Sequence, residues 1–184
     1  MKDEKVSVRG MVYAAMFGAG TAAGAYIIIP LPPVPITLQT LFLNLAGALL
    51  GGRLGALSQV VYVLLGVIGL PVFAGGKAGM GVLLGPTGGY LIGFIVAAYV
   101  VGKLIEIKKN PGFIWNLFSM VAGMIVIYVF GVIQLSFIAR LSINKSILVG
   151  VLPFLIGDGL KIIAAALIIL KIRDKMRFRG YHND

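Results

Sequence analysis

The segment PFLIGDGLK, at residues 153–161, holds the residues best suited to chemistry in this sequence. Asp158 is the one acid inside a long apolar stretch, and Lys161 follows three residues later, so both side chains lie on about the same face of a helix. If this stretch crosses a membrane, each charge costs about 2.5–3.5 kcal/mol to insert at mid-bilayer. The pair therefore either contacts a ligand directly or forms a structural ion pair that locks helices together.

A second candidate is the glycine-rich segment LPVFAGGKAGMGVLLGPT at residues 70–87. Glycine admits backbone conformations closed to other residues and leaves N–H and C=O groups available to a ligand. The segment is not a nucleotide loop, because G-x-x-x-x-G-K-[ST] occurs nowhere in the sequence. It is either a ligand-contacting loop or a tight surface loop. Its single charge, Lys77, either meets an anionic group of a ligand or is solvated.

A third pattern is a ladder of small residues in the first apolar stretch, at Ala15, Ala19 and Ala23. A spacing of four places these residues on one face of a helix, where small side chains allow another helix to approach closely. Packing within the chain and docking of a partner subunit explain this spacing equally well.

Other candidates are weaker. Gln39, Thr40 and Asn44 lie in the second apolar stretch, and Tyr62 and Tyr90 lie in later ones. A tyrosine near a membrane interface is usually an anchor. The sequence has no paired carboxylates, no Ser/His/Asp set, no metal-ligand cluster and no cysteine, so we expect neither an enzyme nor a metal or cofactor site.

The composition indicates the environment in which these residues must be placed. Of the 184 residues, 59% are hydrophobic and 12% are charged, about half the usual ~25%, and the mean hydropathy is +1.02. A chain this apolar is predicted to lie in a lipid bilayer. The net charge of +10 does not indicate nucleic acid as a partner, because the basic residues are dispersed and not interleaved with aromatic ones.

About 20 apolar residues are needed to cross the hydrocarbon core as a helix. We therefore expect an all-α membrane protein whose residues 1–184 form a single integral membrane domain of six transmembrane helices. The expected spans are residues 11–29, 37–51, 54–70, 87–105, 113–139 and 147–172. Little is left for a soluble domain, so nucleotide hydrolysis would have to come from another subunit.

The basic residues predict the orientation. With the N-terminus inside, twelve of the sixteen Lys and Arg residues lie in inner segments, three in outer loops and one, Lys161, within the last span. Inner loops carry the excess of Lys and Arg, so both termini are expected to be cytoplasmic. Segments 30–37 and 70–87 then lie on the outer side, where a lid over a substrate pocket would lie.

Three blocks of this sequence resemble the BioY family of biotin transporters: PVPITLQTL at 33–41, GLPVFAGGKAGMGVLLGPTGGYLIGF at 69–94, and PFLIGDGLK at 153–161. The resemblance covers nearly the whole chain. It implies the substrate-binding S component of an energy-coupling factor (ECF) transporter, a six-helix protein of the cell membrane that captures biotin at the outer face. The implied partners are a transmembrane coupling protein, which would dock on Ala15, Ala19 and Ala23, and two cytoplasmic ATP-binding subunits.

The resemblance also implies roles for the candidate residues. Asp158 would accept a hydrogen bond from the ureido ring of biotin, and Lys161 would neutralise Asp158 and donate to the ureido oxygen or to a backbone carbonyl. The implied remaining contacts are Phe73, Leu83 and Tyr90 over the apolar ring, Lys77 toward the carboxylate tail, and Gln39 as a further polar contact.

Two other classes of function are considered. A stand-alone or ion-coupled carrier would use Asp158 and Lys161 as its ion pathway, but the inverted repeat of broken helices common in such carriers is not evident. A membrane enzyme acting on a lipid would need an acid cluster or a nucleophile, which the chain lacks.

Overall fold

The computed structural model describes the backbone of residues 7–180 and the side chains of residues 7–172. The described part is mostly helical, as expected, but it also contains a short hairpin that the sequence analysis did not predict. In order, the elements are α1 (Val8–Gly24), β1 (Ile28–Ile29), β2 (Ile36–Thr37), α2 (Gln39–Leu50), α3 (Gly52–Val67), α4 (Met80–Leu83), α5 (Gly88–Glu106), α6 (Phe113–Ala139), α7 (Ile143–Gly150), the 3-10 turn η1 (Leu152–Phe154) and α8 (Leu155–Gly180).

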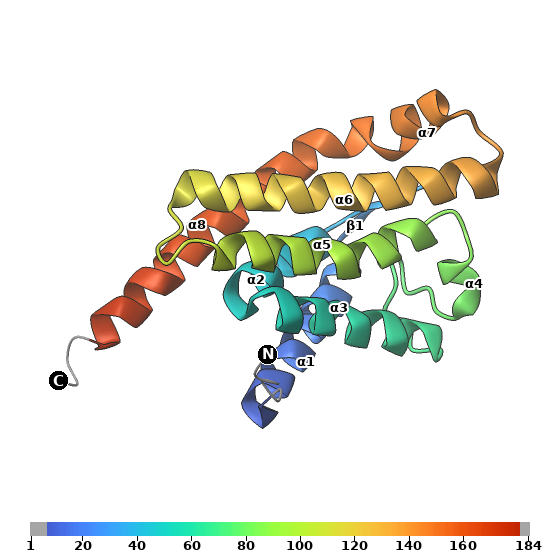
Figure 1. Ribbon diagram of the computed structural model, residues 1–184. Coiled ribbons are helices and arrows are strands. Elements are labelled where there is room, and N and C mark those ends of the chain that lie inside the picture. Colours follow the sequence, from blue (N-terminus) through green and yellow to red (C-terminus); the bar gives the residue numbers. More distant parts are fainter. Residues whose placement is uncertain (1–6, 181–184) are drawn as a thin grey trace.

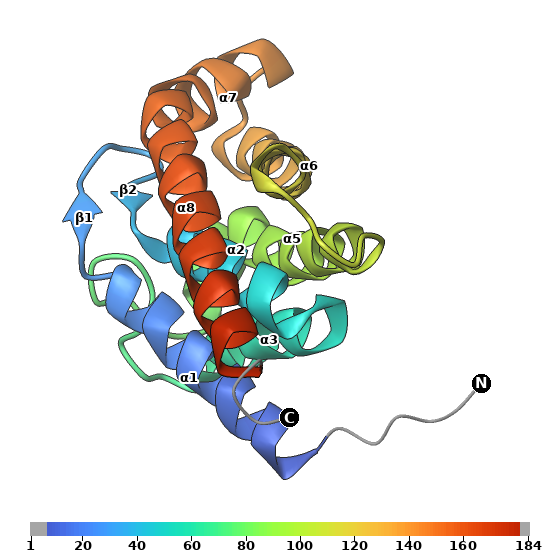
Figure 2. The same cartoon turned by 90° about the vertical axis from the view of Figure 1, so that its left-hand side faces the viewer.

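Helix α5 is the centre of the bundle. It packs along α6 on one side and against α2 and α3 on the other (Figure 1). Helix α1 packs on α2 and α3, while α8 runs obliquely across the bundle and contacts α2 and α6 (Figure 2). The short helices α4 and α7 lie at one end of the bundle, and the turn between α5 and α6 lies at the other end (Figure 1).

Close packing around α5 depends on glycine. A Cβ atom added to Gly102 would lie 2.2 Å from the Gly52 nitrogen and 2.4 Å from the Gly51 carbonyl carbon, so α5 meets the α2–α3 turn backbone to backbone. The carboxylate of Glu106 closes this turn by accepting from the Gly52 N–H at 2.8 Å and from Lys103 Nζ at 2.7 Å. Such close approaches are how helices associate in lipid, where packing rather than the hydrophobic effect holds them together.

The helix expected at residues 11–29 ends early, at Gly24. The chain then extends, and β1 pairs antiparallel with β2 through Ile28–Thr37 and Ile29–Ile36. The tip between the strands carries four prolines, which lack the N–H that a helix needs, and β-branched isoleucines favour the extended backbone on either side. The resulting hairpin occupies part of the segment that we expected to form an outer loop.

The expected last span, residues 147–172, is broken in two. Helix α7 ends at Gly150, and the 3-10 turn that follows contains Pro153, whose ring cannot continue a helix through this point. Gly157 and Gly159 lie within α8 and do not interrupt it. The break at Pro153 therefore places Asp158 in the first turn of a new helix rather than in the middle of a long one.

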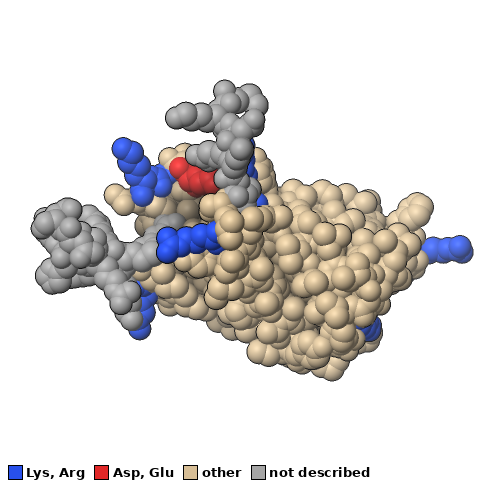
Figure 3. Space-filling model, turned by 90° about the horizontal axis from the view of Figure 1, so that it is seen from below, with Lys and Arg blue, Asp and Glu red and all other residues tan. Residues whose placement is uncertain are grey.

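Within the described residues, three stretches are long and apolar enough to cross a membrane: Gly88–Glu106, Phe113–Ala139 and Ile143–Ile172, the last running through the break. Gln39–Leu50 and Gly52–Val67 are shorter apolar helices. On the face shown in Figure 3, the Lys and Arg side chains lie toward the two ends, with a broad uncharged surface between them. Of the bases used to predict orientation, Lys2, Lys5 and those beyond Ile172 lie outside the described side chains.

We predict that Gly102→Ala destabilises the protein, because the new methyl group has no space against the Gly51–Gly52 backbone. Overpacking of this kind costs about 1–3 kcal/mol, which thermal unfolding of the detergent-solubilised protein would register as a lower melting temperature. Gly81→Ala, also in a helix but with no atom within 4 Å of the added Cβ, is the matched control. Equal melting temperatures for the two variants would contradict this account of the packing.

Candidate ligand-binding site

One cavity contains most of the residues singled out in the sequence. It lies between α2, α5, α6 and α8, has an empty volume of about 700 Å³ including its open mouth, and is bounded by the hairpin and by the loop before α4. Aromatic rings from four different segments form much of its wall. These rings belong to Phe73, Tyr90, Phe94, Tyr128 and Phe154.

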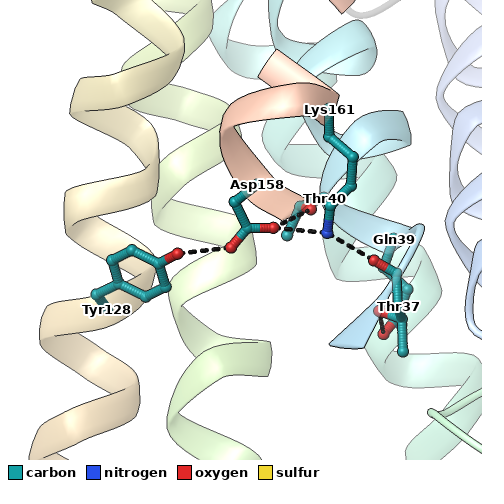
Figure 4. Close-up of polar contacts among 6 residues, drawn as sticks. All are labelled: Thr37, Gln39, Thr40, Tyr128, Asp158 and Lys161. Atoms are coloured by element: carbon teal, nitrogen blue, oxygen red, sulfur yellow. Dashed lines mark hydrogen bonds and ion pairs between the residues drawn. The ribbon is translucent and has the colours of Figure 1, made fainter. Parts of the chain in front are cut away.

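The polar centre of the cavity is the carboxylate of Asp158, a residue only 6% exposed. Oδ1 lies 2.5 Å from Lys161 Nζ and accepts from the Thr40 hydroxyl at 3.2 Å. Oδ2 accepts from the Tyr128 hydroxyl at 2.6 Å. Three helices thus converge on one carboxylate: α2 through Thr40, α6 through Tyr128, and α8 through the aspartate and lysine themselves (Figure 4).

Lys161 connects this centre to the hairpin. Its ammonium donates to the backbone oxygen of Thr37 in β2 at 2.7 Å, and the Thr37 hydroxyl donates to Gln39 Oε1 at 2.8 Å (Figure 4). The Gln39 amide in turn donates to the hydroxyl of Tyr62, a fully buried residue on α3. A continuous polar chain therefore runs from α8 through the hairpin and α2 to α3.

Two segments cover the cavity, and hydrogen bonds join them. These segments, residues 25–38 and 69–79, are called the cavity cover below. The Tyr26 hydroxyl donates to the Pro71 carbonyl, and the Gly75 N–H donates to the Ala25 carbonyl at 3.4 Å. Because each bond joins one segment to the other, the two segments form one connected layer.

In the 69–79 segment, glycines allow the backbone to form a tight turn between Phe73 and Lys77. Gly75 and Gly76 have φ values of +72° and +73°, a left-handed backbone that side chains disfavour. The Gly76 N–H donates to the Phe73 carbonyl at 2.9 Å, and the Phe73 N–H donates to the Lys77 carbonyl at 3.0 Å. These amides are thus engaged within the protein, in contrast to the expectation that the glycine segment leaves N–H groups open.

Six of the seven expected binding residues line the cavity: Asp158, Lys161, Tyr90, Phe73, Lys77 and Gln39. Phe73 is buried and Lys77 is exposed. The Tyr90 hydroxyl donates to the Gly150 carbonyl at 2.9 Å, so its proton is already engaged within the protein.

Leu83 lies outside the cavity, in a separate apolar groove with Leu84, Ile92 and Phe137. Its neighbour Val82 lines the cavity instead. Adjacent residues of a helix point in different directions, and the single turn of α4 directs Val82 rather than Leu83 inward.

Sequence reasoning does not find Tyr128, and it leaves Thr40 as a weak candidate. Tyr128 lies near the middle of the 27-residue helix α6, far from the membrane interfaces where tyrosine usually acts as an anchor. That position is the signal that singles it out: a hydroxyl in mid-span needs a hydrogen-bond partner inside the protein. Thr40 directly follows Gln39 in α2 and has no such distinctive position.

The alanine ladder faces away from the bundle. Ala15, Ala19 and Ala23 are all exposed, whereas Gly18 and Thr21 are buried on the opposite side of α1. A Cβ atom on Gly18 would lie 2.8 Å from the Ser58 carbonyl, so it is this buried side that packs closely on α3. Packing within the described part of the chain therefore does not account for the ladder.

Comparisons with known proteins identify the family. A model of the BioY family matches residues 1–178. The chain is 48% identical over 166 residues to a biotin transporter BioY of Thermotoga maritima, covering 90% of this chain and 96% of the relative. It is 39% identical over 173 residues to a probable biotin transporter BioY of Pyrococcus horikoshii, covering 94% and 98%.

The fold has a close counterpart among solved structures. A crystal structure described as the S-component for biotin from an ECF-type ABC transporter superposes with a TM-score of 0.83 at 32% identity, covering 91% of this chain and 92% of the other. The relatives are named as transporters, which agrees with the expectation of a transport protein rather than an enzyme. The family model, the relatives and the solved structure lead to one conclusion: this chain is a membrane protein that belongs to the BioY family.

Proposed function

We propose that this protein binds biotin as the substrate-binding S component of an ECF importer. The observation that carries the proposal is the buried Asp158–Lys161 pair inside a cavity walled by aromatic rings. A family of proteins named for biotin transport, and a structural counterpart described as a biotin S-component, support the same ligand.

The chemistry of the cavity matches the three parts of biotin. The ureido ring carries N–H donors and one carbonyl acceptor, which suit the Asp158 carboxylate and the Lys161 ammonium. The sulfur ring is apolar and suits Phe73, Phe94 and the ring of Tyr90. The valerate tail is anionic, and Lys77 at the exposed edge of the cavity is its proposed partner.

The proposed setting is the plasma membrane, crossed six times with both termini cytoplasmic. Lys103 and Glu106 lie at the end of α5, with Lys108 just after it, whereas the cavity contacts the beginning of this helix through Tyr90 and Phe94. With the basic α5–α6 turn inside, as the excess of inner bases predicts, the cavity lies toward the outer face. Biotin would then be captured from outside the cell.

The proposed partners are a transmembrane coupling protein and two cytoplasmic ATP-binding subunits. The exposed face of Ala15, Ala19 and Ala23 suits a helix of the coupling protein, because small side chains allow close contact in lipid. The structural counterpart, described as part of an ECF-type ABC transporter, supports this assembly.

The first test is equilibrium binding of labelled biotin to the purified protein in detergent. Biotin should bind, and an analogue that keeps the valerate but lacks the ureido N–H groups should bind far more weakly, because the buried carboxylate would be left without its partner. Equal binding of biotin and the analogue would contradict the role of Asp158. Biotin uptake into liposomes without ATP or other subunits would instead favour the ion-coupled carrier.

Asp158→Asn should weaken biotin binding roughly a hundredfold, because it removes the charged acceptor and leaves Lys161 buried without its counter-charge. Truncating one partner of a buried charge pair costs about 2–5 kcal/mol. Lys77→Ala should cost much less, since water can replace an exposed lysine. Titration of both variants with biotin gives the ranking, and the opposite order would place the anchor in the cavity cover.

Ala19→Trp should separate binding from assembly. A bulky side chain on the exposed face of α1 would hold a docking helix away, so co-purification with the coupling protein and ATP-driven uptake should fall while biotin binding survives. Ile125→Trp, on the exposed surface of α6, is the matched control and should leave assembly intact. Loss of biotin binding with normal assembly would indicate that the alanine ladder serves packing within this chain instead.

A further inference from the structure

The hydrogen bonds that Asp158 already accepts limit the number of acceptor sites that its carboxylate can present to a ligand. A carboxylate has about four lone-pair sites, two on each oxygen. Lys161 and Thr40 occupy both sites of Oδ1, at 2.5 and 3.2 Å, and Tyr128 occupies one site of Oδ2, at 2.6 Å. Among the side chains that the structure describes, these leave one acceptor site open, and it lies on Oδ2.

The same count applies to Lys161. An ammonium group has three N–H donors. One points to Asp158 Oδ1 and one to the Thr37 carbonyl, at 2.5 and 2.7 Å, so one donor remains. The charged pair thus presents one free acceptor and one free donor to the cavity that both residues line.

We propose that Tyr128 is a positioning residue that restricts Asp158 to a single free acceptor, so that the charged pair recognises one N–H/C=O edge of a cyclic urea or lactam. The inference rests on the proposed function and adds a specificity to it. One ureido N–H of biotin bonds to Oδ2 of Asp158, and the ureido oxygen accepts from Lys161. The second N–H is left to a neutral acceptor or to water.

The two ureido N–H groups therefore contribute unequally. A hydrogen bond to a charged group contributes about 1.5–3 kcal/mol, against about 0.5–1.5 kcal/mol for a neutral pair. Among neutral acceptors lining the cavity, Gln39 Oε1 already accepts from Thr37 and has one lone-pair site left. A ligand that keeps only the N–H facing Asp158 should retain most of the affinity.

The test uses the purified protein in detergent and two isomeric lactam analogues of biotin, each with a different ureido N–H replaced by CH₂. We expect one isomer to bind within about 5-fold of biotin and the other to bind roughly 10- to 100-fold more weakly, as loss of a bond to a charged group implies. Equal losses of affinity for the two isomers would overturn the proposal, because both N–H groups would then contribute equally to binding. Biotin itself must bind in this assay, and its failure to do so would count against the proposed function instead.

Tyr128→Phe tests the assigned residue. Without the hydroxyl, Oδ2 gains a second open site and the carboxylate is held less firmly, so biotin affinity should fall about 3- to 10-fold and the difference between the two isomers should shrink. Tyr99→Phe makes the same chemical change on an exposed residue of α5 outside the cavity and should alter neither quantity. If Tyr128→Phe weakens biotin and both isomers by one common factor, Tyr128 has only a structural role and the proposal fails.

Discussion

A carboxylate among apolar helices is stable only when its charge and its lone pairs are satisfied, and this requirement at Asp158 organises the protein. The lysine that neutralises it comes from the same helix, and the hydroxyls that bind it come from α2 and α6. Breaking a buried ion pair by removing one partner typically costs about 3–5 kcal/mol. The Asp158 carboxylate thereby connects α2, α6 and α8, and the same carboxylate lines the cavity.

The break at Pro153 cooperates with this ion pair. Because α8 begins at Leu155, Asp158 lies in its first turn, where the helix dipole favours a negative charge. Lys161 follows on the same face and reaches both the carboxylate and the hairpin. A continuous helix through this region would carry the aspartate in its interior, without the field of a helix start.

The parts that the sequence predicts are those that depend on local spacing. Asp158 and Lys161 are three residues apart, so their pairing follows from helix geometry, and the placement of Ala15, Ala19 and Ala23 on one face of α1 follows from their spacing of four. Long apolar stretches likewise predict α5 and α6 with bounds close to those observed. The BioY resemblance and the comparisons agree on the family.

Contacts between distant segments could not be predicted in this way. Tyr128 meets Asp158 across 30 residues of chain, and no periodicity relates α6 to α8. The hairpin was missed because two-residue strands are too short to show an alternating pattern. Leu83 is expected in the cavity but lies outside it. The rotation of a one-turn helix about its axis is set by tertiary packing, which directs Val82 inward instead.

The connection between the two segments of the cavity cover has a kinetic consequence. Tyr26 and Gly75 join segments that lie some 45 residues apart in the chain, and Lys161 ties the hairpin to α8 as well. Neither segment can move away from the other without breaking these hydrogen bonds, of which the Tyr26 bond lies at an exposed position. Any movement that keeps these bonds must therefore displace both segments together, and association that waits for such a conformational change is slower than diffusional encounter. A release that needs the same joint movement would be slowed by the same three bonds, which link the two segments to each other and the hairpin to α8.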